Sequence, residues 1–282
     1  MTKGNPMQLL IQFSLPLLVG NIFQQLYNMV DSIIVGNFVG ANALGAIGTT
    51  NSLNFFFFSL VAGLSVGIGI IVAQYFGFGD EEKVKDAIGN SIWIITVCSV
   101  IMAIIGFVTA RPILVLLDTD PVILNDAVAY LKVVSIGIVC VGFYNGVSGI
   151  LRALGDSKTP LIFLIVASVL NVILDLIFVL SFGWGVVGAG VATAFSQLIS
   201  ALACIIYAYK SNTYFKLKKK NIKLNGNIIK KSCKLGIPVA LQNSLIAFSL
   251  IVLQKVVNGY GATFTTAFTV VSRIETLVQQ PF

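Results

Sequence analysis

Long apolar runs separated by short polar segments dominate the chain. Each run reaches about 20 residues or more, the length that an α-helix needs to cross the hydrocarbon core of a bilayer. A transmembrane β-barrel has short segments of alternating hydrophobicity instead, and these runs are continuous. The expected spans lie at about residues 9–35, 49–76, 88–110, 129–151, 159–181, 186–209 and 232–257, and an eighth begins near 263. The pattern predicts an all-α, polytopic membrane protein.

Composition supports this class and adds an orientation. The chain is 57% hydrophobic and 10% charged, with a mean hydropathy of +0.94, whereas charged residues make up roughly 25% of soluble domains. The net charge of +7 is interpreted as a topology signal and not as a nucleic-acid footprint. If the N-terminus is inside, the inner loops carry Lys83, Lys85, Arg152, Lys158 and the lysines from Lys210 to Lys234, and the outer loops hold little beyond Arg111 and Lys132. The positive-inside rule therefore places the N-terminus in the cytoplasm and the protein in the cell membrane.

The first and seventh spans resemble each other. Leu15-Pro16 with Asn21 corresponds to Ile237-Pro238 with Asn243 at a constant offset. Six spans separate the two starts, an even number, which indicates a parallel repeat about an axis along the membrane normal. The expected division is a six-helix bundle at 1–209, a cytoplasmic Lys-rich linker at 210–231, and the first one to two helices of a second bundle at 232–282. On this interpretation the chain is the N-terminal half of a protein of about twelve spans, with its C-terminal half missing.

Several kinds of chemistry are excluded by what the sequence lacks. There is no histidine, which removes His-based zinc sites and His general bases. No G-x-x-x-x-G-K-[ST] motif occurs, so the chain is not itself an ATP-driven motor. The four cysteines lie in or beside apolar spans without C-x-x-C spacing and are interpreted as buried hydrophobes. We therefore expect neither an enzyme nor a cofactor, and an energy source in a gradient or in another subunit.

Two carboxylates, Asp31 and Asp175, lie inside apolar spans. A charge at the bilayer centre costs about 2.5–3.5 kcal/mol on insertion scales, and such residues usually handle an ion, a proton or a substrate. The alternative is a hydrogen-bonded acid that only holds helices together. The sequence predicts a site that handles an ion, a proton or a substrate, and it leaves this alternative open.

Polar side chains form stripes on the first, fifth and sixth spans. The stripes comprise Asn21, Gln24, Asn28 and Asp31; Ser168, Asn171 and Asp175; and Thr193, Ser196, Gln197 and Ser200. All three groups are expected in the outer half of the bilayer, where they can converge on one cavity. Gln24, Asn28, Ser168 and Gln197 are expected as possible lining residues of that cavity. The alternative is three separate hydrogen-bonded seams, each contributing about 0.6 kcal/mol per contact.

Three weaker features have simpler interpretations. Gly63 and Gly67 form a small-xxx-small pair that favours close helix packing. Phe55 to Phe58 is expected to face lipid or the bundle interior and not to form a drug cage. Arg273 and Glu275 are expected to face solvent or the absent half.

With these residues in hand, the chain resembles the multidrug and toxic compound extrusion (MATE) family, near its DNA-damage-inducible-F-like prokaryotic branch. The resemblance rests on Pro16 with Gln25, Asp31 and Gly36, on residues 149–156 (Gly-Ile-Leu-Arg-Ala-Leu-Gly-Asp) followed by Pro160, on Asn171 and Asp175 four positions apart, and on Ser272-Arg273-Ile274-Glu275 with Gln279-Gln280-Pro281. It implies a twelve-helix antiporter that exports cationic or amphipathic compounds in exchange for H⁺ or Na⁺. It also implies a cation site at Asp31, Asn171, Asp175 and Thr193, with a possible Na⁺ at Asp31 and Asp175. Some members instead place a Glu in the seventh helix for Na⁺, where this chain has Ile246.

Two other functions stay open at this point. A lipid-linked oligosaccharide flippase of the same superfamily should have a strongly basic cavity, whereas the acids inside the spans favour the antiporter. A non-functional truncated membrane protein is the other alternative. The expected partners are the lipid bilayer and small amphipathic or cationic substrates.

Overall fold

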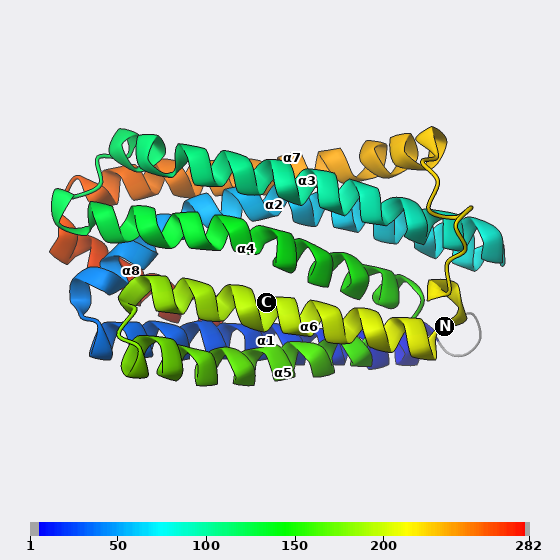
Figure 1. Ribbon diagram of the computed structural model, residues 1–282, viewed down its shortest axis with the longest axis horizontal. Helices are drawn as coiled ribbons and strands as arrows, with labels where there is room; N and C mark the ends of the chain where they lie inside the picture. The colour runs from blue at the N-terminus through cyan, green and yellow to red at the C-terminus, as the bar shows by residue number, and fades with distance from the viewer. Residues whose placement is uncertain (1–5, 280–282) are drawn as a thin grey trace.

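The computed structural model describes residues 6–279, and every regular element in that range is helical. The elements are α1 (Pro6–Phe38), α2 (Ala41–Gly77), α3 (Glu81–Leu116), α4 (Pro121–Ala153), α5 (Lys158–Asp175), the π-helical segment η1 (Leu176–Ser181), α6 (Gly185–Ser211), the 3₁₀ turn η2 (Thr213–Phe215), α7 (Gly226–Asn258) and α8 (Ala262–Gln279) (Figure 1). The all-α prediction is confirmed. Gln280 and Pro281 of the family motif lie outside the described residues.

Short polar turns decide where the helices begin and end. Asp80 accepts a hydrogen bond from Lys83 N (3.1 Å) and thereby caps α3. Asp120 accepts from Val122 N (2.9 Å) at the start of α4, where Pro121 occupies the first turn. Gly40 and Gly79 take positive φ values of 122° and 73° in the turns before α2 and α3, a conformation that glycine adopts at little cost. Because these turns are short, successive helices run antiparallel.

The helices have the length and composition of membrane spans. Among the described residues, α2, α3, α4, α5 with η1, α6 and α7 are long and apolar enough to cross a bilayer. Their outer faces carry large apolar side chains that are mostly exposed, such as Val108 (67% exposed) and Leu245 (69% exposed). Water disfavours such a surface and lipid does not. The chain is a multi-pass membrane protein.

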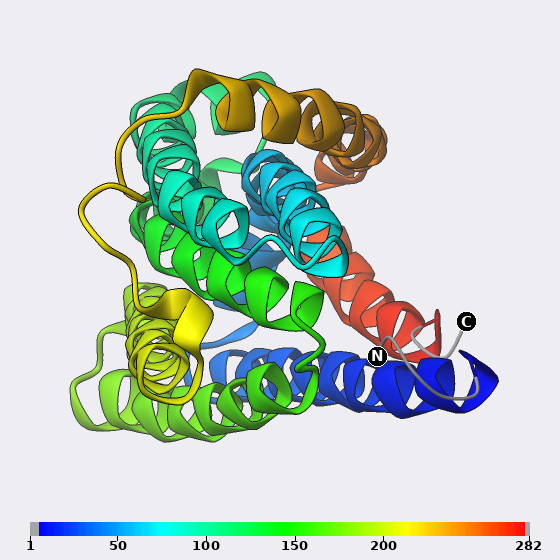
Figure 2. The same ribbon diagram turned by 90° about the vertical axis from the view of Figure 1, so that its right-hand side faces the viewer.

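The helices form two groups that meet along α4. Viewed along the helices, α1, α5 and α6 lie on one side, α2, α3 and α7 lie on the other, and α8 runs between α1 and α2 (Figure 2). The main apolar core joins α2, α3 and α4 through Leu53, Phe57, Leu114, Ile123 and Leu131. The two groups together leave room for a site between α1, α4 and α8.

Glycines on α2 allow α7 to approach closely. A Cβ on Gly63 would overlap the backbone of Ala240, and one on Gly67 would overlap the backbone of Ser232 and Gly236. The interpretation of this pair as a packing motif is confirmed.

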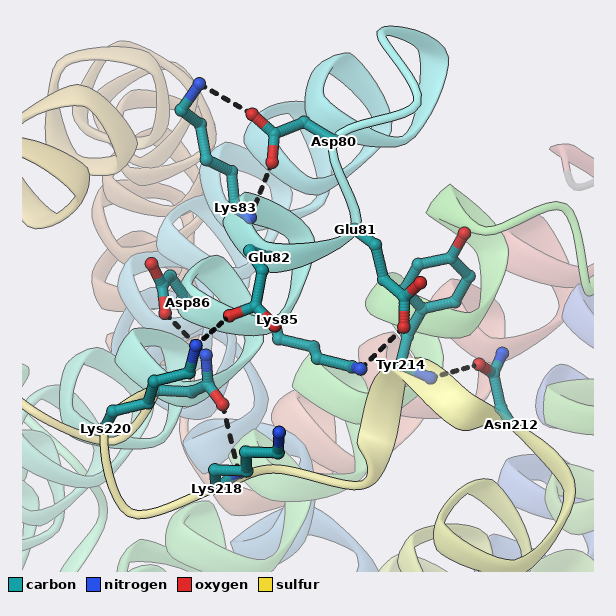
Figure 3. Close-up of polar contacts among 11 residues, drawn as sticks. Asp80, Glu81, Glu82, Lys83, Lys85, Asp86, Asn212, Tyr214, Lys218 and Lys220 are labelled. Atoms are coloured by element: carbon teal, nitrogen blue, oxygen red, sulfur yellow. Dashed lines mark hydrogen bonds and ion pairs between the residues drawn. The ribbon is translucent and has the colours of Figure 1, made fainter.

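The segment between α6 and α7 is fastened to the start of α3. Asn221 Nδ2 donates to Asp86 Oδ1 (2.7 Å), and the backbone N–H of Asn225 donates to Asn90 Oδ1 (2.8 Å). Figure 3 shows this end of the molecule, where Lys220 also pairs with Glu82 (2.6 Å). The hydrogen bond from Lys220 lowers the pKa of the exposed Glu82. Helix α7 begins at Gly226, inside the segment expected to be linker, because Asn225 caps it by accepting from Asn227 N and Ile228 N.

Candidate functional site

The polar stripe of α1 faces the interior of the molecule. Gln24, Asn28 and Asp31 are spaced by four and three residues, so they lie on one side of the helix. Asp31 is 7% exposed, whereas Leu26 and Ile33 on the opposite side are 42% and 50% exposed. The side chains thus follow the amphipathic pattern of the sequence, with the carboxylate directed inward.

Asp31 and Asp175 meet where α1 packs against α5. Asp175 is 0% exposed, and the two carboxyl groups are within hydrogen-bonding reach of each other. The Oδ1 atom of each carboxyl group is buried without a hydrogen-bond partner. Two negative charges this close in a medium of low dielectric repel strongly. The pair therefore requires a shared proton or a bound cation.

Asn171 joins this pair to α6. It lies one turn before Asp175 and is 1% exposed. The amide orientation that satisfies both of its ends donates to Asp175 Oδ2 (3.3 Å) and accepts from Thr193 N (3.3 Å). The Thr193 hydroxyl donates to Ala189 O (3.1 Å), so its oxygen keeps a free lone pair. The structure thus brings together all four residues that the sequence suggested as cation ligands.

The donor set is made of oxygens from two carboxylates, one amide and one hydroxyl. Oxygen ligands suit a hard cation, and a carboxyl pair also holds a proton. Within residues 6–279 no group of three or more His, Cys, Asp or Glu side chains is placed to hold a metal ion. The two orphaned carboxylate oxygens are the observation that fits H⁺ or Na⁺ at this position.

A cavity of about 330 Å³ adjoins the acid pair. Asp31 and Thr193 open into it, together with the expected lining residues Gln24, Asn28 and Gln197. The remaining polar and charged lining consists of Asn21, Tyr27, Asn51, Asn54, Tyr130, Tyr144, Asn145, Arg152, Ser157 and Arg273. The cavity therefore receives side chains from α1, α2, α4, α5, α6 and α8.

Ser168 does not reach the cavity surface. It is buried, and its hydroxyl donates to Leu164 O (2.8 Å) one turn earlier in α5. Asn171 and Asp175 lie behind the wall that Asp31 and Thr193 form. The polar stripe of α5 thus supplies one acid of the pair and does not line the cavity.

Arg273 points into the cavity and not toward solvent. Helix α8 packs against α2, which brings Arg273 Nη2 to Asn51 Oδ1 (3.3 Å), while its Nε is buried without a partner. The sequence shows only that Arg273 lies near the end of the chain. The contact depends on packing between segments more than 200 residues apart, which no local pattern encodes.

Aromatic side chains also line the cavity. Phe55 and Phe58 reach it, whereas Phe57 is 2% exposed in the core, so the expectation of lipid-facing or packing roles for Phe55 to Phe58 holds for only part of that run. Tyr27 and Tyr130 are further lining residues that the sequence analysis did not single out. Tyr27 could have been found, because it lies four residues before Asp31 on the same face of α1.

Known proteins that are similar to this chain include several described as multidrug transporters. The family model described as MatE matches residues 16–177. The probable multidrug resistance protein YpnP of Bacillus subtilis (strain 168) is 33% identical over 281 residues, which cover 99% of this chain and 62% of that protein. The solved structure of the MATE multidrug transporter DinF-BH superposes with a TM-score of 0.91 at 27% identity, covering 99% of this chain and 63% of that chain. An inward-facing multidrug resistance MATE family transporter gives a TM-score of 0.83 at 27% identity, and the match covers 89% of this chain and 57% of that chain. The chain spans about three fifths of the length of the curated relatives it matches.

Proposed function

The chain belongs to the MatE family of multidrug and toxic compound extrusion proteins, and from this premise we propose that the protein is a secondary active antiporter. It exports cationic or amphipathic compounds in exchange for H⁺ or Na⁺. On this proposal it is a transporter and not an enzyme, and its only cofactor is the coupling ion. The relative YpnP is described as a probable multidrug resistance protein, which supports the same class of substrate.

The buried pair of Asp31 and Asp175 carries this proposal. The two acids share one dry position, and each leaves a carboxylate oxygen without a partner. Occupation by a cation removes the repulsion between them, so the bundle has two states that differ in charge. A potential of 100 mV supplies about 2.3 kcal/mol for each elementary charge that moves across the membrane, enough to bias such a switch.

The position of the pair explains how an ion and a substrate can compete. Asp31 belongs both to the acid pair and to the cavity wall. A cation on Asp31 neutralises the charge that a cationic compound in the cavity would otherwise bind. Ion entry therefore lowers the affinity of the cavity for such a compound, which is the differential affinity that exchange requires.

The presence of acids in and behind the cavity supports the antiporter over the flippase. A strongly basic cavity is the expected feature of the flippase, whereas Asp31 here faces a cavity that also holds Arg152 and Arg273. This mixture of signs, with the acid pair behind it, favours ion-coupled exchange.

Export should follow an imposed ion gradient. In inverted membrane vesicles that contain the full-length gene product, uptake of ethidium is expected when the vesicle interior is made acidic or loaded with Na⁺. Abolishing the gradient with an ionophore should return uptake to the level of vesicles without the protein. Uptake that persists after both gradients are removed would contradict the antiport mechanism.

We also propose that the N-terminus and the segment between α6 and α7 are cytoplasmic, as the distribution of lysines indicates. Single cysteines at Ser211, at the end of α6, and at Asp118, between α3 and α4, lie at opposite ends of the bundle. In a background without other reactive thiols, a membrane-impermeant reagent added to intact cells should label the cysteine at position 118 and not that at position 211. Labelling of both from outside would overturn this orientation.

A further inference from the structure

Arg152 is a half-buried cation without a partner. It lies in the last turn of α4 and lines the main cavity. In the part of the chain that the structure describes, no hydrogen bond or ion pair engages its guanidinium group. A buried charge normally has a partner, because its desolvation is otherwise uncompensated.

Two polar residues near Arg152 make their hydrogen bonds with other groups. Asp156, four residues later, accepts from Thr159 N (3.0 Å) at the first turn of α5. The Tyr144 hydroxyl donates to Pro160 O (2.9 Å). The dipole at the end of α4 makes a positive charge tolerable there, but an exposed side chain would gain the same benefit. The dipole alone therefore does not account for a guanidinium group turned into a cavity.

A second cavity meets the first at Arg152. It measures about 370 Å³ and lies between α2 and α4. Its lining is apolar except for Ser65, Asn145 and Arg152, and both Asn145 and Arg152 also line the main cavity. Asn145 lies two turns before Arg152 on the same face of α4. An apolar slot thus ends at a free guanidinium group, an arrangement that matches an acidic head with an apolar body.

Arg152 and Asp31 lie at different ends of the main cavity, whereas Arg273 lies at the same end as Asp31. Tyr130, early in α4, lies at the end near Asp31, whereas Arg152 is 22 residues further along the same helix. That separation corresponds to about 33 Å at 1.5 Å per residue. Arg152 is therefore independent of the cation site and available to a different chemical group. The planar guanidinium fork suits the two oxygens of a carboxylate, a sulfonate or a phosphate.

We propose that Arg152 is the recognition residue of an anion subsite, so that the cavity accepts amphipathic compounds with a carboxylate, sulfonate or phosphate group as well as cations. The apolar slot between α2 and α4 holds the hydrophobic part of the compound. This inference rests on the proposed function in one respect, because it takes the cavity to be the place where exported compounds bind.

The subsite can be tested with two dyes that differ in one group. Rhodamine B has a free carboxylate, and its ethyl ester has the same ring system without that charge. Binding to the full chain in nanodiscs of zwitterionic lipid, measured by fluorescence anisotropy, should be tighter for rhodamine B. Arg152→Gln should weaken rhodamine B binding by about tenfold or more, the value of one hydrogen bond between charged groups. Binding of the ester should be unchanged.

Two further variants separate recognition from structure. Arg152→Lys keeps the charge but not the fork, and should give an intermediate loss for rhodamine B. Arg111→Gln removes an exposed arginine of α3 at the opposite end of the bundle and should change neither dye. If both dyes bind and Arg152→Gln and Arg152→Lys leave the preference for rhodamine B unchanged, the anion subsite is wrong while the antiporter proposal stands. If neither rhodamine B nor its ester binds the unmodified chain, the cavity is not a binding place for such compounds, and both proposals fail.

Discussion

Asp175→Asn in the full-length gene product is expected to abolish gradient-coupled export while the protein still folds and reaches the membrane. Asparagine has nearly the same shape, so the packing of α5 against α1 and α6 should survive. It carries no charge, however, and the cation loses a ligand and its main electrostatic attraction. We expect a loss of at least about tenfold in the coupled rate, since exchange requires the ion to discriminate between two states. Ethidium uptake into inverted vesicles under an imposed pH or Na⁺ gradient measures this directly.

Substitutions of the other site residues should reduce coupled export by as much as Asp175→Asn or by less. Asp31→Asn should lose coupling to a similar extent, because Asp31 forms the second half of the acid pair and the cavity wall. Thr193→Ala should weaken coupling less, because it removes one neutral ligand. Asp126→Asn makes the same chemical change at an exposed position of α4 and is the matched control. Unchanged export and ion dependence in both the Asp31 and Asp175 variants would mean that the acids only hold helices together.

Gly67→Ala is expected to destabilise the protein even though alanine is the better helix former. Its methyl group would overlap the backbone of Ser232 and Gly236, which are parts of α7 and cannot rotate away as a side chain can. Overpacking of this kind typically costs about 1–3 kcal/mol, and here the whole of α7 must shift. Thermal unfolding followed by tryptophan fluorescence should show a lower midpoint.

Gly69 provides a control on the same helix. A Cβ there meets nothing closer than Gly149 O at 3.6 Å, an ordinary contact. Gly69→Ala should therefore be neutral or raise stability by up to about 1 kcal/mol, the helix-propensity difference between the two residues. Equal midpoints for the two alanine variants would show that the contact between α2 and α7 is not close enough to require glycine.

The spacing of polar residues along each helix and their expected depth in the bilayer make much of this molecule predictable. The spans follow from the length of the apolar runs, and the meeting of Asp31 with Asp175 follows from two polar faces at the same depth. Helix α7 begins at Gly226, before the expected span at 232–257, because Asn225 caps it. The division into bundles at 1–209, 210–231 and 232–282 stays a prediction.

Contacts between helices that are far apart in the chain could not be predicted from the sequence. Arg273 meets Asn51 because α8 returns along α2, and Tyr130 meets the acid pair's cavity because α4 lies at the centre of the bundle. Neither residue belongs to a polar stripe of its own. The pattern of polar and apolar residues along one helix identifies the face that turns inward. It does not identify the helix that packs against this face.

The π-helical segment η1 begins directly after Asp175, and it changes the angular spacing of side chains around the helix axis. A π turn holds an extra residue in comparison with an α turn. Each residue of an α-helix advances the side chain by about 100°. The ring of Phe178 in this segment stacks on the rings of Phe182 and Trp184, which follow it. A buried acid and a cluster of stacked rings are thus neighbours along the chain, and the π-helical segment is the junction between them.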